Sequence, residues 1–411
     1  MIPASSVCRS CGSSDVTVFL DLGKTPLSDR LVRPEDLSGP EPHFQLTVAF
    51  CASCSMVQVL EDIPQETLFP EDYPYFSSFS DLVLEHSRRH VEQLVANRQL
   101  DESNLVVELA SNDGYLLRNF VERGVPVLGI DPTPQQCQAA NEVGVRTICR
   151  FFSEALAEEL ASDGVQADVI IANNVMAHIP DINSFVAGMA KLLAPGGLIT
   201  VENPYLRDLI DQAEFDTIYH EHIFYHSCTG VATLMRRHGL HLNHVEHFPD
   251  LHGGTLRYHI SHEDFTTPAL DSYLAAEASS GLTSIAYYEG FGKRVAAIKA
   301  QLLRLLGDLR SAGKTIAGYG AAAKGSTLLN YAGVGRDLVE FVVDRNVHKH
   351  GMHMPGTHQP ILHPDALQER MPDYVLLLAW NFKDEVVAQQ QAYVDAGGRF
   401  IVPIPSPEVV S

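Results

Sequence analysis

One short stretch of the chain brings together side chains that could do acid–base chemistry. Between Phe215 and His222 four consecutive residues supply a phenol, a carboxylate and two imidazoles: Tyr219, His220, Glu221 and His222. An imidazole titrates near neutral pH, so this cluster can remove a proton from carbon while a neighbouring donor steadies the negative charge that develops. A metal site and a polar surface loop are alternatives for the same residues. The elements that position the stretch must decide between them.

The stretch follows a series of apolar runs that predict the strands of a parallel sheet. They cover residues 105–110, 125–130, 145–149, 168–172 and 198–201, after an expected helix at 81–97. Mostly helical patterns separate them, which is typical of a doubly wound α/β fold with its ligands at the carboxyl ends of the strands. Polar residues follow several of these runs and form a candidate ligand site: Glu108, Ser111, Asn112, Asp113, Gly114, Asp131, Asn173, Asn174 and His178.

These strand ends favour a ligand that has a ribose and a cationic tail. The first turn has no G-x-G-x-x-G pattern, so a pyrophosphate would find no glycine-lined approach to the backbone. Asp131 is placed to accept from ribose hydroxyls, while Glu108 and Asp113 favour positive charge. Together with Pro195-Gly196-Gly197 before the last strand, this pattern resembles a class I S-adenosylmethionine methyltransferase. The resemblance implies that S-adenosylmethionine is held by Glu108, Ser111, Asn112, Asp113, Gly114, Asp131 and Asn173.

Two C-x-x-C pairs near the start of the chain predict a zinc site. Cys8 and Cys11 form one pair, Cys51 and Cys54 the other, and two such turns make the tetrahedral thiolate cage that Zn²⁺ prefers. A four-cysteine site has no open coordination position, so we expect this zinc to be structural. Four reduced core cysteines, or a single redox pair, are the alternatives.

The last third predicts a second α/β domain. Gly318-Tyr319-Gly320-Ala321-Ala322-Ala323 fits G-x-G-x-x-A at a strand–helix turn, and Asp344 ends the next expected strand. A glycine turn that feeds a helix N-terminus is an anion site, and Lys324 would add charge there. The anion could be NAD or a nucleotide diphosphate, and the loop could also be a turn without a ligand. Upstream, the Gly253-Gly254 pair allows either close approach of a ligand or a tight hairpin.

Several motifs together are similar to the sugar C-methyltransferases of deoxysugar pathways. They are the zinc module, S-N-D-G at 111–114, N-x-x-x-H at 174–178 and I-Y-x-E-H at 218–222, and the match extends to the end of the chain. Within that family the chain most resembles the C-3′-methyltransferases of dTDP-4-keto-deoxysugars of the tetronitrose and kijanose type. The resemblance implies a zinc module at 1–70, a methyl-donor domain at 71–265 and a Rossmann-like sugar-nucleotide domain at 266–411. The first loop departs from the usual E-x-G, because Ala110 stands at the glycine position.

The reaction suggests a role for each candidate residue. Carbon methylation needs a carbon nucleophile, and the C3 hydrogen beside a 4-keto group is acidic enough for a base to remove. We expect His222 to be that base, Glu221 to orient it, and Tyr219 and His178 to stabilise the enolate oxygen. Asn174 is expected to hold the sugar, and the family resemblance implies that Tyr75 and Ser78 line the same pocket and that Lys324 faces the sugar nucleotide. Methyl transfer onto an enolate does not require a metal at Glu221 and His222.

The composition of the chain excludes some classes of protein function. The 411 residues carry a net charge of −22, which argues against a zinc-dependent nucleic-acid binder, since that function needs clustered Lys and Arg. No run of about 18 apolar residues and no charged-then-apolar leader is present, so we expect a cytoplasmic protein without a membrane span. Its three domains are expected to suffice as a monomer. C-5 methylation of a 4-keto sugar and an NAD(P)-dependent oxidoreductase are the rival enzymes.

Overall fold

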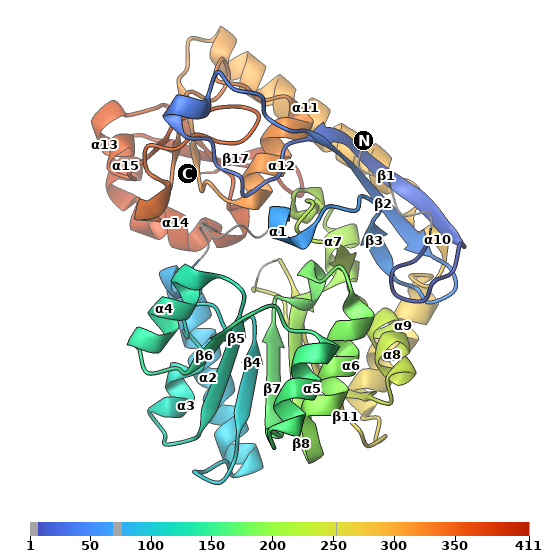
Figure 1. Ribbon diagram of the computed structural model, residues 1–411. Helices are drawn as coiled ribbons and strands as arrows, with labels where there is room; N and C mark the ends of the chain where they lie inside the picture. The colour runs from blue at the N-terminus through green and yellow to red at the C-terminus, as the bar shows by residue number, and fades with distance from the viewer. Residues whose placement is uncertain (1–6, 69–75, 252, 411) are drawn as a thin grey trace.

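The computed structural model describes residues 7–68, 76–251 and 253–410, and these form three β-sheets with their covering helices (Figure 1). The central sheet lies in the lower half of Figure 1, the C-terminal sheet lies above it, and the N-terminal strands lie at the upper right. Tyr75 and His252 fall outside the described residues.

The N-terminal sheet is completed by a strand that directly follows the Phe215–His222 stretch. Its order is β1-β2-β3-β9, with β1 at Val16–Thr25, β2 at Phe44–Cys51, β3 at Val57–Val59 and β9 at Phe224–Tyr225. The pair β3–β9 is antiparallel, with Val57 opposite Tyr225. Three short helices belong to this part of the chain: η1 (Pro34–Asp36), α1 (Gln65–Leu68) and η2 (Ser77–Phe79). The N-terminal module therefore holds the segment that follows His222.

The central sheet has the order β10-β11-β8-β7-β4-β5-β6. Its parallel strands are β4 (Val106–Leu109), β5 (Val127–Asp131), β6 (Thr147–Cys149), β7 (Ala167–Asn173) and β8 (Leu193–Pro204), and β10 (His241–Phe248) and β11 (Thr255–Ser261) add an antiparallel hairpin. The helices are α2 (Asp81–Arg98), α3 (Arg118–Val121), α4 (Pro134–Glu142), α5 (Glu154–Ser162), η3 (Met176–His178), α6 (Ile182–Leu192), α7 (Leu206–Asp211), η4 (Phe215–Thr217) and α8 (Cys228–Arg237).

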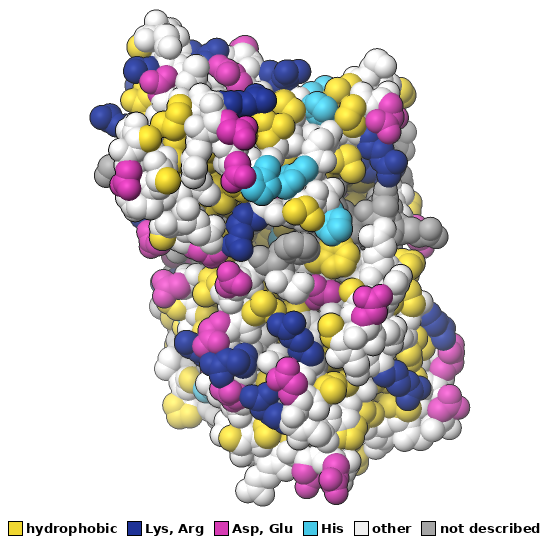
Figure 2. Space-filling model, turned by 90° about the vertical axis from the view of Figure 1, so that its left-hand side faces the viewer, with side chains coloured by type: hydrophobic (Ala, Val, Ile, Leu, Met, Phe, Trp, Pro, Cys, Tyr) yellow, Lys and Arg dark blue, Asp and Glu magenta, His cyan; other side chains and the backbone are white. Residues whose placement is uncertain are grey.

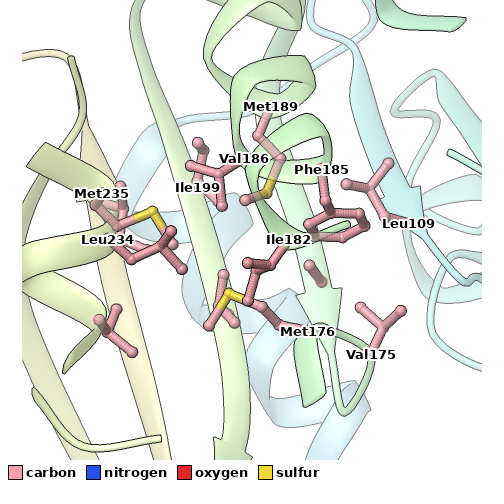
Figure 3. Packing of buried hydrophobic residues seen from close by; sticks show 14 of the residues in the cluster. Leu109, Val175, Met176, Ile182, Phe185, Val186, Met189, Ile199, Leu234 and Met235 are labelled. Atoms are coloured by element: carbon pink, nitrogen blue, oxygen red, sulfur yellow. The ribbon is translucent and has the colours of Figure 1, made fainter. Parts of the chain in front are cut away.

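Helix α6 shows why these helices cover the sheet. Asp181 caps it, since its side chain accepts from the Ser184 amide, and apolar residues follow at spacings of three and four. Figure 3 shows this face packed against residues of β4 and β8; it consists of Ile182, Phe185, Val186 and Met189, all buried. Each such side chain contributes about 1.5–3 kcal/mol when it leaves water. This packing fixes the strand ends that carry the polar residues.

The C-terminal part is a second, smaller α/β unit. Its sheet has the order β14-β13-β12-β15-β16-β17, with β12 (Ile316–Tyr319), β13 (Val342–Val343), β14 (Ile361–Leu362), β15 (Tyr374–Leu377), β16 (Arg399–Val402) and β17 (Glu408–Val410). Its helices are α10 (Ile285–Tyr288), α11 (Phe291–Ser311), α12 (Ala323–Ala332), η5 (Val347–Lys349), α13 (Ala366–Arg370), η6 (Trp380–Phe382), α14 (Lys383–Gln389) and α15 (Gln391–Asp395). Helix α9 (Pro268–Ser280) precedes them and packs against α8 and β10 of the central part. The long helix α11 runs along the upper edge in Figure 1.

The predicted α/β class and the doubly wound central sheet are confirmed. Every apolar run named above falls on a strand, and the helix expected at 81–97 is α2. Gly253 and Gly254 lie between β10 and β11 in left-handed conformation, with φ of 88° and 114°. A Cβ at Gly254 would approach the Asp208 carboxylate to 2.2 Å, so the close neighbour of this glycine is protein rather than open space.

Candidate active site

Two hydrogen bonds fix the ring of His222. The Tyr219 hydroxyl lies 2.7 Å from His222 Nε2, and His222 Nδ1 lies 3.0 Å from the Thr217 carbonyl oxygen. Because a carbonyl oxygen can only accept, Nδ1 carries the proton and Nε2 presents a lone pair that accepts from Tyr219. The phenol and imidazole rings lie against each other, with centroids 4.0 Å apart. The arrangement provides a base and a donor side by side.

The group that orients His222 is not the one expected from the sequence. The carboxylate of Glu221 accepts from the Asp29 amide at 3.3 Å, while the Thr217 carbonyl occupies the position at Nδ1 where a triad carboxylate would stand. Burial, together with the nearby Asp29 carboxylate, raises the pKa of Glu221 to about 8. Glu221 therefore ties the Phe215–His222 stretch to the N-terminal module. The sequence does not reveal this contact, because neighbouring residues in a loop can point their side chains in different directions.

The N-terminal module makes further contacts with the same stretch. His220 Nε2 lies 2.9 Å from the Gln45 carbonyl oxygen, and desolvation lowers the pKa of His220 to about 4. The Val59 amide donates to the Ile223 carbonyl at 2.8 Å. Residues on both sides of His222 are thus attached to the module that carries the cysteines.

His178, the last residue of η3, packs beside His222. The two ring centroids are 4.7 Å apart, and His178 Nδ1 lies 2.7 Å from the Glu221 carbonyl oxygen. Desolvation lowers the pKa of His178 to about 4, so the ring is neutral at physiological pH. With the proton on Nδ1, its Nε2 is an acceptor. The donor role that the sequence suggested for His178 is therefore corrected: this ring can hold a hydroxyl but not an enolate oxygen. Asn174, which precedes it, has a left-handed φ of 53° and donates its amide to the Glu202 carbonyl at 2.7 Å.

A small cavity adjoins His222. Its volume of about 10 Å³ is room for one water-sized group, and its lining includes Asn203, Thr217, Tyr225 and His226. Asn203 is fully buried at the end of β8, and neither side-chain amide atom has a hydrogen-bond partner among the described residues. Buried amides are almost always paired, so this one is available to a ligand or a water molecule. Sequence reasoning missed Asn203, although a polar residue directly after an apolar run was the available signal.

The carboxyl ends of β4 and β5 form the second part of the site. Asp131 ends β5, where its carboxylate accepts from the Asn112 and Thr133 amides, each at 2.9 Å, and from the Thr133 hydroxyl. These bonds join the two loops and hold the carboxylate still. Oδ1 accepts both bonds from Thr133, whereas Oδ2 accepts the one from Asn112, so a second lone pair on Oδ2 can accept from a ribose hydroxyl.

Several buried polar atoms near these strand ends have no hydrogen-bond partner among the described residues. They are Glu108 Oε2, Ser111 Oγ, Asp113 Oδ1 and Asn173 Oδ1. Burial and the neighbouring Asp113 and Asp131 carboxylates raise the pKa of Glu108 well above its usual range. A cationic ligand would relieve this cost, and a neutral or anionic one would not. The residues therefore fit the sulfonium and ribose of S-adenosylmethionine.

The backbone of the first loop is also specialised. Ala110 has φ of 57° in the left-handed region, which explains why glycine is usual at this position. A Cβ on Gly114 would contact Ala140 Cα at 3.3 Å, so this glycine allows α4 to pack closely. Ser78 lies at the rim, since its amide donates to Asp113 Oδ2 at 3.2 Å.

Lys324 lies at the junction of the central and C-terminal parts. Its ammonium stands 4.8 Å from the centre of the Trp380 ring, whose Nε1 donates to Asp216 Oδ2 at 2.7 Å. Burial raises the pKa of Asp216 to about 6 and that of Glu214 to about 8, and Lys324 opposes both shifts. The glycine turn beside it already has an internal acceptor, because the Ala321 amide donates to Asp344 Oδ2 at 2.7 Å. Sequence reasoning did not connect Lys324 with the two acids.

The four predicted cysteines meet at one point. Cys8 Sγ lies 3.6 Å from Cys54 Sγ, and Cys11 Sγ lies 3.7 Å from Cys51 Sγ, with all four sulfurs within 4.8 Å of one another. A tetrahedral Zn²⁺ with Zn–S bonds of about 2.3 Å places its sulfurs roughly 3.8 Å apart. The thiolate cage therefore fits zinc.

Charges on the surface are mixed. On the face shown in Figure 2, Lys and Arg side chains alternate with Asp and Glu and form no continuous basic band. Among the described helices, none is both long enough and apolar enough to cross a membrane.

Comparison with known proteins gives matches to three family models. A zinc binding domain matches residues 8–69, a methyltransferase domain matches 83–245, and a C-methyltransferase C-terminal domain matches 250–405. The C-methyltransferase NovU of Streptomyces niveus is 38% identical over 409 residues, which cover 98% of this chain and 96% of NovU. The arsenite methyltransferase of Aquipseudomonas alcaligenes is 32% identical over 175 residues, covering 39% of this chain and 47% of that protein.

Among solved structures, the magnesium protoporphyrin IX methyltransferase of Synechocystis PCC 6803 with bound S-adenosylmethionine covers 48% of this chain and 97% of its own. Its TM-score is 0.37 and its sequence identity is 14%. Residues 83–245 of the methyltransferase model contain the strand ends described above, and residues 8–69 contain the four cysteines. The relationship to NovU spans both regions and the C-terminal unit, so the chain belongs to the family of zinc-containing, S-adenosylmethionine-dependent C-methyltransferases.

Proposed function

We propose that the protein methylates C3 of a dTDP-linked 4-keto-deoxysugar through an enolate. The observation that carries the proposal is the Tyr219–His222 pair, with its oxygen and nitrogen 2.7 Å apart. In a 4-keto sugar the acidic C3 hydrogen and the carbonyl oxygen belong to adjacent carbons. A base and a hydrogen-bond donor must then be close neighbours, as these two are.

The resting hydrogen bond defines how the pair acts. It leaves Nε2 of His222 unprotonated, because the Thr217 carbonyl keeps the proton on Nδ1. When the substrate carbonyl takes the Tyr219 hydroxyl as its donor, the Nε2 lone pair of His222 faces the C3 hydrogen instead. His222 is then the base, and Tyr219 stabilises the oxygen that becomes negative.

The proposed reaction has three steps. His222 Nε2 takes the proton, and the C3–H electron pair enters the enolate. S-adenosylmethionine supplies an electrophilic methyl group, so the C3–methyl bond forms as the methyl–sulfur bond breaks and S-adenosylhomocysteine leaves. His222 then returns its proton to solvent. The protein contributes acid–base chemistry and exclusion of water, and this scheme needs no metal at Glu221 and His222.

The remaining residues are proposed to hold the two ligands. Asp131 accepts from the ribose, and Glu108, Asp113 and Asn173 face the cationic end of the methyl donor, within a loop built from Ser111, Asn112 and Gly114. Asn174 and His178 contact the sugar, together with Tyr75 and Ser78. We place the nucleotide towards Lys324, at the junction with the C-terminal unit. Membership of this family makes the chain a methyltransferase, so the alternative of an NAD(P)-dependent oxidoreductase is excluded.

C-5 methylation is the second candidate. The C5 hydrogen is also next to the C4 carbonyl, so the same base and donor could serve it with the sugar turned over. We prefer C3 because the chain resembles the C-3′-methyltransferases of dTDP-4-keto-deoxysugars; the motifs at 174–178 and 218–222 serve either carbon. The family, fold and metal site described above are the same for both carbons.

Calorimetric titration tests the ligand part of this proposal. S-adenosylhomocysteine and dTDP should each bind with micromolar affinity and should bind additively, while NAD⁺ should give no heat. Lys324→Met should weaken dTDP binding and leave S-adenosylhomocysteine binding unchanged. Binding of NAD⁺ with dTDP silent would contradict the sugar-nucleotide assignment.

A further inference from the structure

A second group of metal-ligand side chains lies on the antiparallel hairpin at the edge of the central sheet. His244 of β10 stands directly opposite His259 of β11, and Glu246 lies two residues along β10. Side chains two residues apart on a strand point to the same face, so all three share one side of the hairpin. Each is half-buried and therefore reachable from water.

The distances within this group suit a metal ion. His259 Nε2 lies 2.6 Å from Glu246 Oε1, and the two imidazole rings have centroids 5.2 Å apart. One ligand atom from each residue lies within 4.8 Å of the others. Around a metal with bonds of about 2.0–2.2 Å, tetrahedral ligand atoms stand roughly 3.3 Å apart. Small side-chain rotations would bring the three ligand atoms to this separation.

A β-bulge aligns the two histidines. It falls between Leu242 and His244, shifts the register by one residue and leaves Asn243 as the extra residue. The Asn243 side chain secures the bulge, since its Nδ2 donates to Ser261 Oγ at 3.0 Å and to the Glu263 carbonyl at 2.8 Å. His244 Nδ1 is 3.0 Å from the Thr267 hydroxyl, which leaves Nε2 for a ligand.

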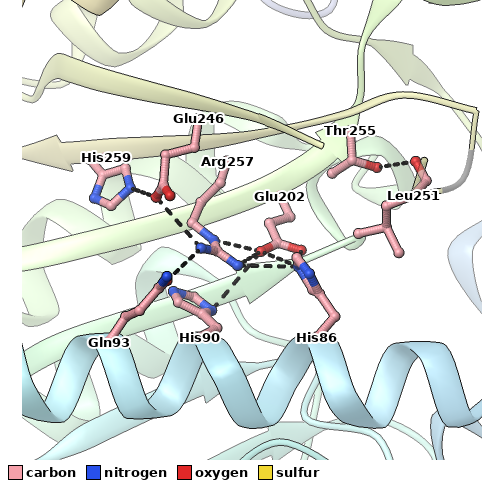
Figure 4. A network of polar contacts seen from close by, with 9 residues as sticks. All are labelled: His86, His90, Gln93, Glu202, Glu246, Leu251, Thr255, Arg257 and His259. Atoms are coloured by element: carbon pink, nitrogen blue, oxygen red, sulfur yellow. Dashed lines mark hydrogen bonds and ion pairs between the residues drawn. The ribbon is translucent and has the colours of Figure 1, made fainter. Parts of the chain in front are cut away.

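A buried ion pair supports the carboxylate from behind. Figure 4 shows Glu246 between His259 and Arg257, above helix α2. Arg257 Nη1 lies 3.5 Å from Glu246 Oε1, and Arg257 Nε lies 2.6 Å from Glu202 Oε1. Arg257 and Glu202 are each 1% exposed, so this support is rigid. Outer contacts of this kind hold metal-binding side chains in place.

We propose that His244, Glu246 and His259 bind a divalent transition-metal ion of the Zn²⁺ or Ni²⁺ class. Two imidazoles and a carboxylate are ligands that such ions accept, whereas Mg²⁺ and Ca²⁺ prefer oxygen ligands alone. The ion takes the place of the proton that His259 Nε2 and Glu246 Oε1 share, and that proton moves to Nδ1 of His259. Three protein ligands leave the fourth position to water.

This site differs from the four-cysteine cage in kind. The cage has four protein ligands and no open position, so its ion is structural. The hairpin site is open and reachable from solvent, and its ion can exchange. His259 lies opposite Thr200 in the middle of β8, so the hairpin site is away from the carboxyl end of β8, where Asn203 lies. Binding there fastens the outermost strand β10 to β11.

Titration of the zinc-loaded protein with NiCl₂ in a calorimeter tests the proposal, with zinc content measured afterwards to show that the cage has not exchanged. The result expected is binding of a single Ni²⁺ with micromolar affinity. His244→Gln and His259→Gln should each weaken it by at least about tenfold, the lower limit of what loss of even an outer-shell partner costs. His262→Gln, an exposed histidine near the end of β11, is the matched control and should bind as the wild type does.

Thermal unfolding provides the second measurement. Ni²⁺ should raise the melting temperature of the wild type and of His262→Gln, because a ligand that binds only the folded state stabilises it. It should not raise that of Glu246→Gln, whose own melting temperature without Ni²⁺ shows whether it is folded. The proposal is overturned if no Ni²⁺ binds beyond the cage, or if all the variants bind it equally.

Discussion

The Tyr219–His222 pair gives the sharpest prediction about mechanism. In His222→Asn the new amide nitrogen can still donate to the Thr217 carbonyl, as Nδ1 does now, but nothing replaces the Nε2 lone pair. In His222→Gln the amide reaches the position of Nε2 and loses the bond to Thr217. The Asn variant therefore keeps the loop and removes the base.

The size of the effect follows from the role. General base catalysis contributes about 10²–10⁴-fold, which corresponds to roughly 3–5 kcal/mol of transition-state stabilisation. We expect kcat of His222→Asn to fall by that factor. Tyr219→Phe should lose on the order of 10²-fold, the cost of one donor to a developing oxyanion. Because the two side chains act on one proton and one carbonyl, the double variant should lose less than the product of the single losses.

The assay is transfer of a labelled methyl group under saturating substrate, with S-adenosylhomocysteine affinity measured calorimetrically on each variant. Methyl-donor affinity should be unchanged throughout, since neither residue lies at the ends of β4 and β5. Near-wild-type kcat in His222→Asn would refute His222 as the base. Multiplicative losses in the double variant would show that the two residues act separately.

Three further predictions follow from the same structure. Asp131→Asn should weaken S-adenosylhomocysteine binding by about 10–100-fold in calorimetry, because charge-assisted hydrogen bonds to the ribose are lost; equal affinity would show that Asp131 only holds the loops. Glu221 has a folded pKa of about 8, above its unfolded value, so the wild type should lose stability as pH rises from about 5 to 8. Glu221→Gln should remove this loss, worth at most about 5 kcal/mol, and a melting-temperature gap between the two proteins that does not widen with pH would contradict the assignment. Cys51→Ser or a chelator should unfold the N-terminal module and abolish turnover, since β2 and β3 hold β9; zinc-free protein with an intact fold and full activity would refute a structural role.

The central fold was predictable because its signals are local. Apolar runs with helical patterns between them identify strands β4 to β8, and polar residues directly after those runs locate the strand ends that the structure brings together. The cysteine pairs were equally plain, since C-x-x-C spacing has a direct geometric meaning.

The contacts of the Phe215–His222 stretch were not predictable, because they depend on segments distant in sequence. Glu221 contacts Asp29, and β9 joins a sheet that begins some two hundred residues earlier in the chain. The tautomer of His178 follows from a backbone carbonyl, which has no sequence signature. The buried acids around Lys324 were likewise invisible, since they come from a separate unit of the fold.

Hydrogen exchange in the substrate tests the central claim most directly. A dTDP-4-keto-deoxysugar is incubated in D₂O with the protein and S-adenosylhomocysteine in place of the methyl donor, and its C3 and C5 proton signals are followed by NMR. The enolate mechanism predicts that the C3 proton signal disappears with the wild-type protein and persists with His222→Asn. The C5 proton signal should not change with either protein. Retention of the C3 proton in the presence of active wild-type protein, or exchange confined to C5, would contradict it.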